Sequence, residues 1–388
     1  MRRFRPFALV FALVAASAAQ AGDDARQAVN EGLATFRAGD TDHAIRLLTD
    51  AINSHELGET TLATVYYDRG GMYLAKADYD DAIADADKAV KLWPGYGDAL
   101  KLRGTAHFAR NDADAAIADF RAASAALPHD LGVHVDLGNA LRVKGRFDEA
   151  LAEFSAAIAM KPNALAYAGR AVVYISMNRS EPAIADLNEA IRLQPDYVTA
   201  YVDRAGAYST LGKFDLAAAD FETVLKYRPG DANATAGLAN AHARLGRVDQ
   251  AMAGYDQMLA ANPSDPSAHR KRGDALFAAR QYAKAIDDYT AALAAAPDAS
   301  TLMNRGAAYH SLGQFARAID DYTAALKLTP DDARIYNNRG NAYAAMSKFD
   351  QAIADYDAAL RIQPGYAEAM RNRDGAMKAK TTGKKVQG

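Results

Sequence analysis

A proline recurs at nearly constant intervals through most of this 388-residue chain, and this regularity constrains the fold more than any single motif. The prolines are Pro94, Pro128, Pro162, Pro195, Pro229, Pro263, Pro297, Pro330 and Pro364. Successive prolines lie about 34 residues apart, and two of the intervals are shorter than the rest by a single position. Each short interval lacks its residue just after a proline, where a turn tolerates the loss. A period of this length predicts a stack of similar supersecondary units.

Each period contains two segments with helical periodicity. The first carries a small residue about ten positions after the proline, and the second carries a small residue followed four positions later by a ring or a leucine. In the second segment these residues are Ala116 and Phe120, Ala150 and Phe154, Ala183 and Leu187, Ala285 and Tyr289, Ala318 and Tyr322, and Ala352 and Tyr356. Small residues allow helix axes to approach, and the rings fill the space between units. The pattern predicts helix hairpins that each end at a proline.

The repeat resembles that of the tetratricopeptide repeat (TPR) family, whose 34-residue signature is W-x2-L-G-x2-Y, A-x3-F and P. Residues 336–343 read Y-N-N-R-G-N-A-Y, and Ala352, Tyr356 and Pro364 follow in register. The leucine that usually precedes the glycine is Arg339 here. The resemblance implies an all-α fold, a right-handed α-solenoid of about ten helix hairpins with a C-terminal capping helix.

The repeat also predicts the domain boundaries. Nine clear units occupy about 61–366, and a degenerate first unit occupies about 26–55, so the array covers 22–366. Residues 367–380 repeat only the first helix of a unit and are more polar, as expected of a cap over the last apolar face. Residues 381–388 are predicted to be a disordered tail.

The N-terminus has the features of a cleavable export signal. Arg2, Arg3 and Arg5 precede an apolar run, which ends near the small-x-small site Ala19-Gln20-Ala21. The run is short for a membrane anchor, which is the alternative interpretation. We therefore expect 1–21 to be a signal peptide, no stable membrane span after its cleavage, and a periplasmic or secreted mature chain.

Composition and motifs argue against several functions. The net charge is −3, which gives no reason to expect nucleic-acid binding, and the chain has no cysteine for disulfides, thiol chemistry or thiolate metal sites. We find no H-E-x-x-H, phosphate-binding loop or G-x-S-x-G motif. Every Asp-rich stretch falls on a repeat position. We therefore expect no enzyme activity, no catalytic residues, no cofactor and no metal.

An arginine precedes the small residue of the first segment in most units, and an acid precedes the ring position of the second. Examples are Arg305 with Asp321 and Arg339 with Asp355. We expect these residues to pair across packed helices and to fix the stacking register. A row of anion-binding sites is the alternative. One unit lacks both members and has Leu238 and Gly254 instead.

The TPR resemblance implies that the first helices of the units line a groove that binds an extended peptide or a partner segment. Counted from the repeat, the middle of this groove is small and apolar, whereas its C-terminal part is polar and basic. The candidate groove residues are Asn304, Asn338, Asn372, Arg334, Asn337, Asn341, Arg371, Arg270 and Lys271.

Three of these asparagines, Asn304, Asn338 and Asn372, recur at intervals of one repeat period. Amide side chains both donate and accept, so such a row could hold a peptide backbone. It is similar to the asparagine ladder of the O-linked N-acetylglucosamine transferases and to part of the carboxylate clamp of co-chaperone TPR domains. The clamp's lysine is absent, because Ser300, Arg334 and Glu368 stand at its position. The alternative is that the asparagines are simply solvated.

These features predict a non-enzymatic scaffold for protein–protein interaction, whose partner is a protein or an extended peptide, with an extended or acidic segment in the C-terminal groove. The alternative function is an accessory subunit of an envelope polysaccharide or outer-membrane assembly machine, with glycan contact in the groove.

Overall fold

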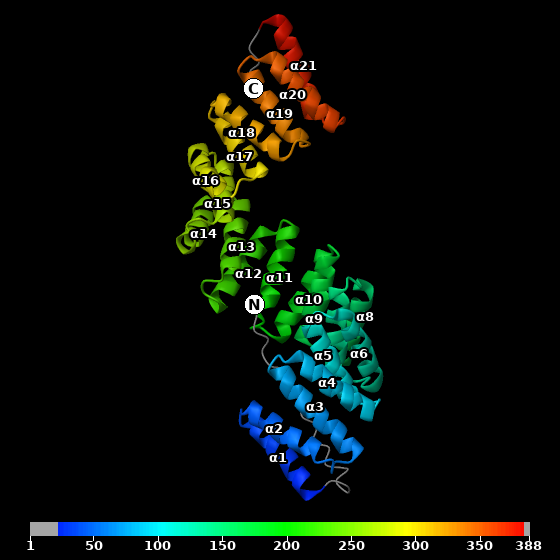
Figure 1. Cartoon of the computed structure of the whole chain (residues 1–388). Helices are drawn as coiled ribbons and strands as arrows, with labels where there is room; N and C mark the ends of the chain where they lie inside the picture. Colours follow the sequence, from blue (N-terminus) through cyan, green and yellow to red (C-terminus); the bar gives the residue numbers. More distant parts are fainter. Residues whose placement is uncertain (1–21, 384–388) are drawn as a thin grey trace. The chain divides into compact units, whose positions relative to one another are not determined.

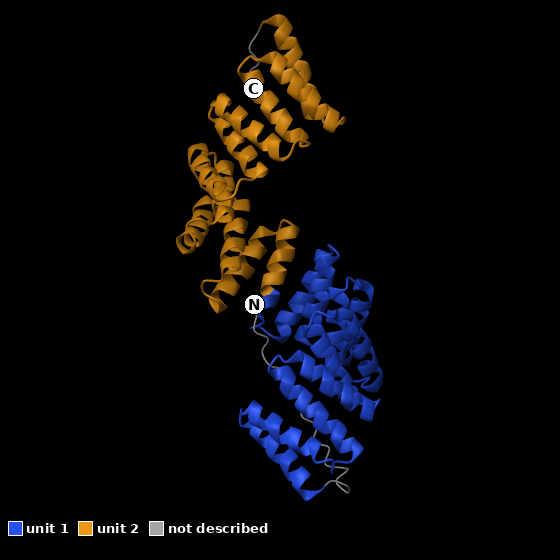
Figure 2. Ribbon diagram, viewed as in Figure 1, with its two compact units in different colours: residues 1–200 blue, residues 201–388 orange. Residues whose placement is uncertain are grey.

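The protein is described by a computed structural model that covers residues 22–383, and its described part is entirely α-helical apart from turns. The predicted signal peptide, 1–21, lies outside the described residues. The chain divides into two compact units, unit 1 ending at Ala200 and unit 2 beginning at Tyr201, which are coloured separately in Figure 2. Each unit is a solenoid stack of helix hairpins (Figure 1).

Five hairpins lie within unit 1. Their helices are α1 (Asp23–Arg37), α2 (Thr41–Asn53), α3 (Glu59–Ala75), α4 (Tyr79–Leu92), α5 (Gly97–Ala109), α6 (Ala113–Ala126), α7 (Leu131–Val143), α8 (Phe147–Met160), α9 (Ala164–Ser176) and α10 (Ser180–Leu193).

Unit 2 begins inside α11 and continues with α12, the four hairpins from α13 to α20 and a single last helix, α21. These helices are α11 (Val198–Thr210), α12 (Phe214–Tyr227), α13 (Ala232–Arg244), α14 (Val248–Ala261), α15 (Pro266–Ala278), α16 (Tyr282–Ala295), α17 (Ala299–Ser311), α18 (Phe315–Leu328), α19 (Ala333–Ala345), α20 (Phe349–Ile362) and α21 (Ala367–Thr382).

The core of each unit lies where a second helix packs between two first helices. The small residues Ala150, Ala318 and Ala352 are fully buried, and the rings of Phe154 and Tyr356 are 0–1% exposed. Close approach explains the glycine of the first helix. A Cβ atom on Gly340 would lie 2.6 Å from Cε1 of Tyr356, which is closer than real contacts allow.

The turn inside most hairpins contains one residue with positive φ, which ends the first helix. This residue is a glycine at Gly145 (φ 72°) and Gly313 (φ 74°) and an asparagine at Asn111 (φ 64°). Glycine adopts this left-handed conformation without steric cost, and asparagine tolerates it better than most residues. A residue in the left-handed conformation therefore ends the first helix in these hairpins.

The last helix is longer than the sequence predicts. The sequence predicts a cap over 367–380 and a disordered tail from 381, whereas α21 continues to Thr382. The hydroxyls of Thr381 and Thr382 donate to the carbonyl of Lys378 at 2.8 and 2.9 Å, and Gly383 ends the helix with φ 66°. The prediction for 381 and 382 is therefore wrong, and 384–388 lie outside the described residues.

Candidate functional site

The odd-numbered helices form one face of each unit, which we call the inner face. In unit 1, α3 contacts α5, α5 contacts α7 and α7 contacts α9, and in unit 2 the same holds from α13 to α21. Even-numbered helices instead pack between two odd-numbered ones, as α4 does between α3 and α5 and α18 does between α17 and α19. A side chain two residues before the small Gly or Ala of a first helix lies on this face. We call this the row position, and Asp68, Asp136, Lys271, Asn304, Asn338 and Asn372 occupy it.

Two asparagines of the predicted ladder bind within the chain. The Nδ2 atom of Asn304 on α17 donates to Oδ1 of Asp274 on α15 at 2.9 Å. The hydroxyl of Tyr289 donates to the same oxygen at 2.8 Å. On α21, Nδ2 of Asn372 donates to Oδ1 of Asn341 on α19 at 3.0 Å. Asn304 and Asn372 thus tie successive first helices together.

Asn337 departs most from its prediction as an exposed residue of the inner face. Its side chain is 0% exposed, and α21 covers it. Its Nδ2 donates to Glu368 at 3.2 Å, and its Oδ1 accepts from Asn372 at 3.0 Å. Asn341 is also satisfied, because it accepts from the hydroxyl of Tyr356 at 2.8 Å. Asn337 is therefore a buried packing residue, and its prediction as an exposed groove residue is wrong.

Asn338 differs from its neighbours in the row because no hydrogen bond of its side chain is found among the described residues. Asn304 finds Asp274 thirty residues earlier and Asn372 finds Asn341 thirty-one residues earlier, but the corresponding residues before Asn338 are Ala308 and Ala307. Asn338 is half-buried on the inner face and keeps an amide that can both donate and accept.

The basic candidates fall into two groups. Arg334 is held by Asp332 at the start of its own helix, with Nη2 2.7 Å from Oδ2, and this pair lowers the pKa of Asp332. Arg270 and Lys271 are half-buried on α15, and Arg371 is exposed on α21. None of these last three has an ion pair among the described residues, so they remain available to a ligand.

The inner face of unit 1 carries carboxylates that the sequence analysis did not single out. Asp68 on α3 and Asp136 on α7 occupy the row position two repeats apart, and both are half-buried. Burial raises the pKa of Asp68 to about 7, against the opposing effect of Arg37. Burial also raises the pKa of Asp136 to about 6, although Lys101 lowers it. The signal was present, because both aspartates stand at the position that Asn304 and Asn338 occupy further along.

A third inner-face carboxylate, Asp98, lies in the first turn of α5, and burial raises its pKa. The adjacent Lys101 is already engaged, since its Nζ lies 2.9 Å from Oδ2 of Asp130. Row-position chemistry is thus acidic on α3 and α7 in unit 1, whereas from α15 to α21 in unit 2 it is basic or amide-bearing.

The predicted arginine–aspartate pairs are confirmed. In each, Nε and Nη2 of the arginine donate to the two oxygens of one aspartate on the second helix of the same hairpin, at 2.5–2.9 Å. The pairs are Arg69–Asp85, Arg103–Asp119, Arg170–Asp186, Arg204–Asp220, Arg272–Asp288, Arg305–Asp321 and Arg339–Asp355.

The third arginine nitrogen connects one hairpin to the one before it. Nη1 of Arg305 donates to Thr290 at 3.0 Å, and Nη1 of Arg339 donates to Thr323 at 3.0 Å. The forked geometry of the guanidinium makes both connections at once. One hairpin uses another solution, in which Nδ1 of His134 lies 2.7 Å from Glu153. The bonds explain why these charges recur along the repeat, and none of the seven paired arginines keeps a free guanidinium for an anion.

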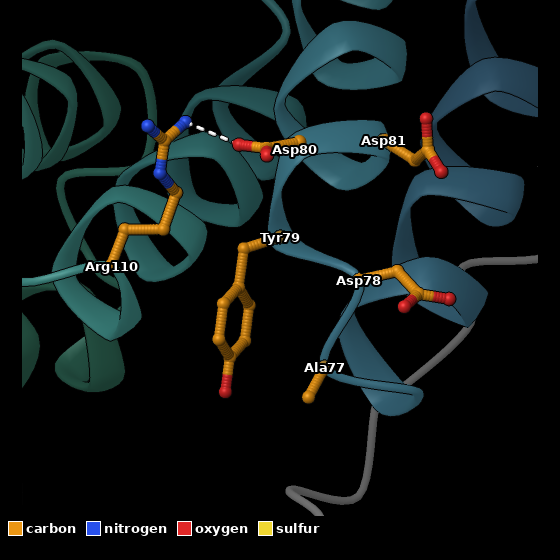
Figure 3. A pocket seen from close by; sticks show the side chains of 6 residues that line it. All are labelled: Ala77, Asp78, Tyr79, Asp80, Asp81 and Arg110. Carbon is orange, nitrogen blue, oxygen red and sulfur yellow. Dashed lines mark ion pairs between the residues drawn. The ribbon is translucent and has the colours of Figure 1, made fainter.

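Neither of two surface pockets in the described residues resembles a catalytic site. The first, of about 340 Å³, is open and is lined by Ala77, Asp78, Tyr79, Asp80, Asp81 and Arg110 (Figure 3). Arg110 lies 2.6 Å from Asp80, and Asp80 and Asp81 belong to the first turn of α4, where negative charge favours the helix. The second pocket, near α14–α16, is lined in part by Arg272 and Asp288, which form one of the arginine–aspartate pairs.

Within 22–383, no cluster of three or more His, Asp or Glu side chains could hold a metal ion. No helix in the same range is both long and apolar enough to cross a membrane.

Comparisons with known proteins agree with the repeat. A family model described as TPR repeat matches 306–347. Models described as tetratricopeptide repeat match 67–130, 107–173, 164–197, 210–274, 253–300 and 333–366. Together these matches span most of the chain.

Among curated proteins, the chain is 36% identical over 77 residues to heat shock protein STI1 of Saccharomyces cerevisiae. This match covers 20% of the chain and 13% of the relative, so the chain spans about an eighth of that protein's length. Among solved structures, it is similar to the APC/C hetero-tetramer Cut9–Hcn1, with 18% identity, a TM-score of 0.46, and 91% and 90% of the two chains covered. It is also similar to yeast Tom70, with 16% identity, a TM-score of 0.44, and 92% and 96% covered.

Proposed function

Because the chain belongs to the tetratricopeptide repeat family, we propose that it is a non-enzymatic scaffold that binds an extended segment of a partner protein on its inner face. This proposal rests on the unsatisfied polar side chains at the row position. Asp68, Asp136, Lys271 and Asn338 occupy it with polar groups that no hydrogen bond or ion pair within the described residues satisfies. Polar groups held half-buried and unpaired cost stability, and a ligand that pairs with them recovers that cost.

The chemistry of the two units defines two kinds of contact. In unit 2, Asn338 can hold a peptide backbone while Arg270, Lys271 and Arg371 favour acidic side chains. In unit 1, Asp68, Asp98 and Asp136 favour a lysine or arginine side chain. We propose that an acidic stretch of the partner binds unit 2 and that a basic residue binds unit 1.

A display library of random dodecapeptides selected against the full chain tests this proposal. Fluorescence anisotropy of the selected peptides is then compared between the wild type and two variants, Lys271→Ala/Asn338→Ala and Asp68→Asn/Asp136→Asn. We expect acidic peptides to bind the first variant about tenfold more weakly and basic peptides to bind the second about tenfold more weakly.

The matched control is Ser311→Ala/Asp331→Ala, which changes two exposed residues away from the row position. Unchanged affinity in both inner-face variants would contradict the proposal. Binding of envelope polysaccharide, with no peptide selected, would instead favour the accessory role in an envelope assembly machine.

We also propose that the mature chain is exported to the periplasm or secreted, on the basis of the basic, apolar and small-x-small segments within 1–21. The intact mass of protein recovered from the envelope fraction would show whether these residues have been removed.

A further inference from the structure

The last helix, α21, has the sequence position of a first helix but no second helix follows it among the described residues. It packs on α20 and α19 with one side (Figure 1). The opposite side corresponds to the side of α19 that α20 covers. We call this side the open face, formed by Met370, Arg373, Asp374 and Met377. Every complete hairpin of the chain shows what belongs on such a face, which is an amphipathic helix.

The apolar part of the open face lies in two methionines. Met370 and Met377 stand one repeat period after Tyr336 and Tyr343 of α19. Tyr343 packs with Phe349 and Ile353 of α20, whereas Met370 and Met377 remain 37% and 42% exposed. Methionine side chains adapt to varied partners and are common on surfaces that bind helices.

The polar part is an incomplete arginine fork. Arg373 stands one repeat period after Arg339 and keeps the connection to the preceding hairpin, with Nη1 3.3 Å from Oδ1 of Asp357. In Arg339, Nε and Nη2 both donate to Asp355 of the covering helix. In Arg373, Nη2 makes only a long contact, of 3.4 Å, with Asp374. Its Nε is buried without a partner among the described residues. A buried donor without an acceptor is costly, and an acid on an incoming helix would satisfy it.

We propose that the open face of α21 is a docking site for an amphipathic helix of a partner protein, which carries an acid for Arg373 and apolar residues for Met370 and Met377. Charge complementarity supports an acidic partner. Lys380 is held by Asp350 of α20 and Arg371 lies on the inner face, so the acid is required by Arg373, whose Nε has no acceptor among the described residues. This site is separate from the inner face, so it adds a second partner contact to the proposed scaffold.

One substitution on the open face restricts the docking helix further. Asp374 stands where Gly340 of α19 allows the ring of Tyr356 to approach. A ring at the equivalent place in the partner would collide with the side chain of Asp374. The chain contains a suitable precedent, because Ala171 replaces the glycine in α9 and Leu187 replaces the ring in α10. The docking helix is therefore expected to carry an acid followed by leucine, as in Asp186-Leu187.

The α10 sequence, 180–193, supplies the probe for a direct test. A labelled peptide of this sequence is titrated into the full chain, which is labelled with ¹³C at its methionine methyl groups. We expect saturable shifts confined to Met370 and Met377. A peptide with Asp186→Asn is expected to bind about tenfold more weakly, and a peptide of the α20 sequence, 349–362, is also expected to bind more weakly because of its tyrosine.

Two variants of the chain serve as controls. Met377→Glu is expected to abolish binding without changing the circular dichroism spectrum, because the side chain is already exposed. Arg373→Lys keeps the charge but loses the fork, so its preference for the Asp peptide over the Asn peptide is expected to be clearly smaller than that of the wild type. Three results would overturn the proposal: no methyl shifts, shifts that do not depend on Asp186, or self-association of the peptide-free chain that Met377→Glu abolishes, which would identify a second copy as the occupant.

Discussion

At the scale of single residues, the half-buried carboxylate of Asp68 shows how a position on the inner face carries a cost. No ion pair of Asp68 is found among the described residues, and burial raises its pKa to about 7. The arginine-paired aspartates, such as Asp321 and Asp355, are more deeply buried but have two donors each. Asp68 loses hydration on burial without a donor to compensate, whereas each arginine-paired aspartate exchanges its hydration for two hydrogen bonds.

The raised pKa predicts how stability depends on pH. In the folded chain Asp68 holds its proton up to about pH 7, whereas in the unfolded chain it releases the proton near pH 4. The folded state therefore loses stability as pH rises between these two values, and the loss is complete above the folded pKa. Asp68→Asn removes this loss, so its melting temperature should exceed that of the wild type at pH 8 by an amount equivalent to about 1–2 kcal/mol.

The advantage of Asp68→Asn should shrink as the pH is lowered toward 4. Thermal melts at pH 4, 6 and 8 measure it, and the exposed Asp331→Asn is the matched control. A variant that is equally or less stable than the wild type at pH 8 would show that Asp68 is well solvated or paired.

At the scale of the helix pair, much of the structure follows from the repeat alone. The hairpins, the small-residue crossings, the ring positions and the arginine–aspartate pairs all recur at one spacing, so each copy supports the others. Asn337 was predicted wrongly because its environment depends on Glu368 and Asn372, which belong to the non-repeating cap. Asp68 and Asp136 are not among the predicted residues, although they occupy in earlier repeats the position that Asn304 and Asn338 occupy later. Hydrogen bonds between first helices join residues 30, 31 or 35 positions apart rather than one full period, so an alignment of the repeats does not display them.

The arginine–aspartate pair predicts an asymmetric response to mutation. Arg305→Leu leaves Asp321, which is 6% exposed, without its two donors. Removing one member of a buried pair costs about 3–5 kcal/mol, whereas replacing both with apolar residues costs much less. We expect Arg305→Leu to lower the melting temperature clearly and Arg305→Leu/Asp321→Ala to recover part of the loss.

Peptide binding on the inner face should be unchanged in Arg305→Leu at temperatures where the variant is folded. If affinity fell while the melting temperature did not change, the arginine row would be a ligand site and its structural assignment would be wrong.

At the scale of the whole chain, the stability of a solenoid unit depends on the interfaces between neighbouring hairpins, because each hairpin contacts mainly the hairpins beside it. Within unit 2, the hairpin of α13 and α14 lacks the arginine–aspartate pair, because Leu238 and Gly254 replace its members. Local opening should therefore be easiest there, and amide hydrogen exchange should be faster in α13 and α14 than in α17 and α18.

The missing pair can be restored only if the backbone approach is restored with it. A Cβ atom on Gly254 would lie 2.8 Å from Cβ of Ala239, so an aspartate at 254 also requires glycine at 239. The triple variant Leu238→Arg/Ala239→Gly/Gly254→Asp should slow amide hydrogen exchange in α13 and α14. Glu222 lies sixteen residues before position 238, so it can accept a hydrogen bond from Nη1 of the new arginine, as Asp256 does from Nη1 of Arg272. Leu238→Arg alone, the matched control, should speed exchange because its charge has no aspartate to bind. If the triple variant exchanged as fast as the control, the pair would not set the cooperativity of the stack, and packing of the rings alone would have to account for it.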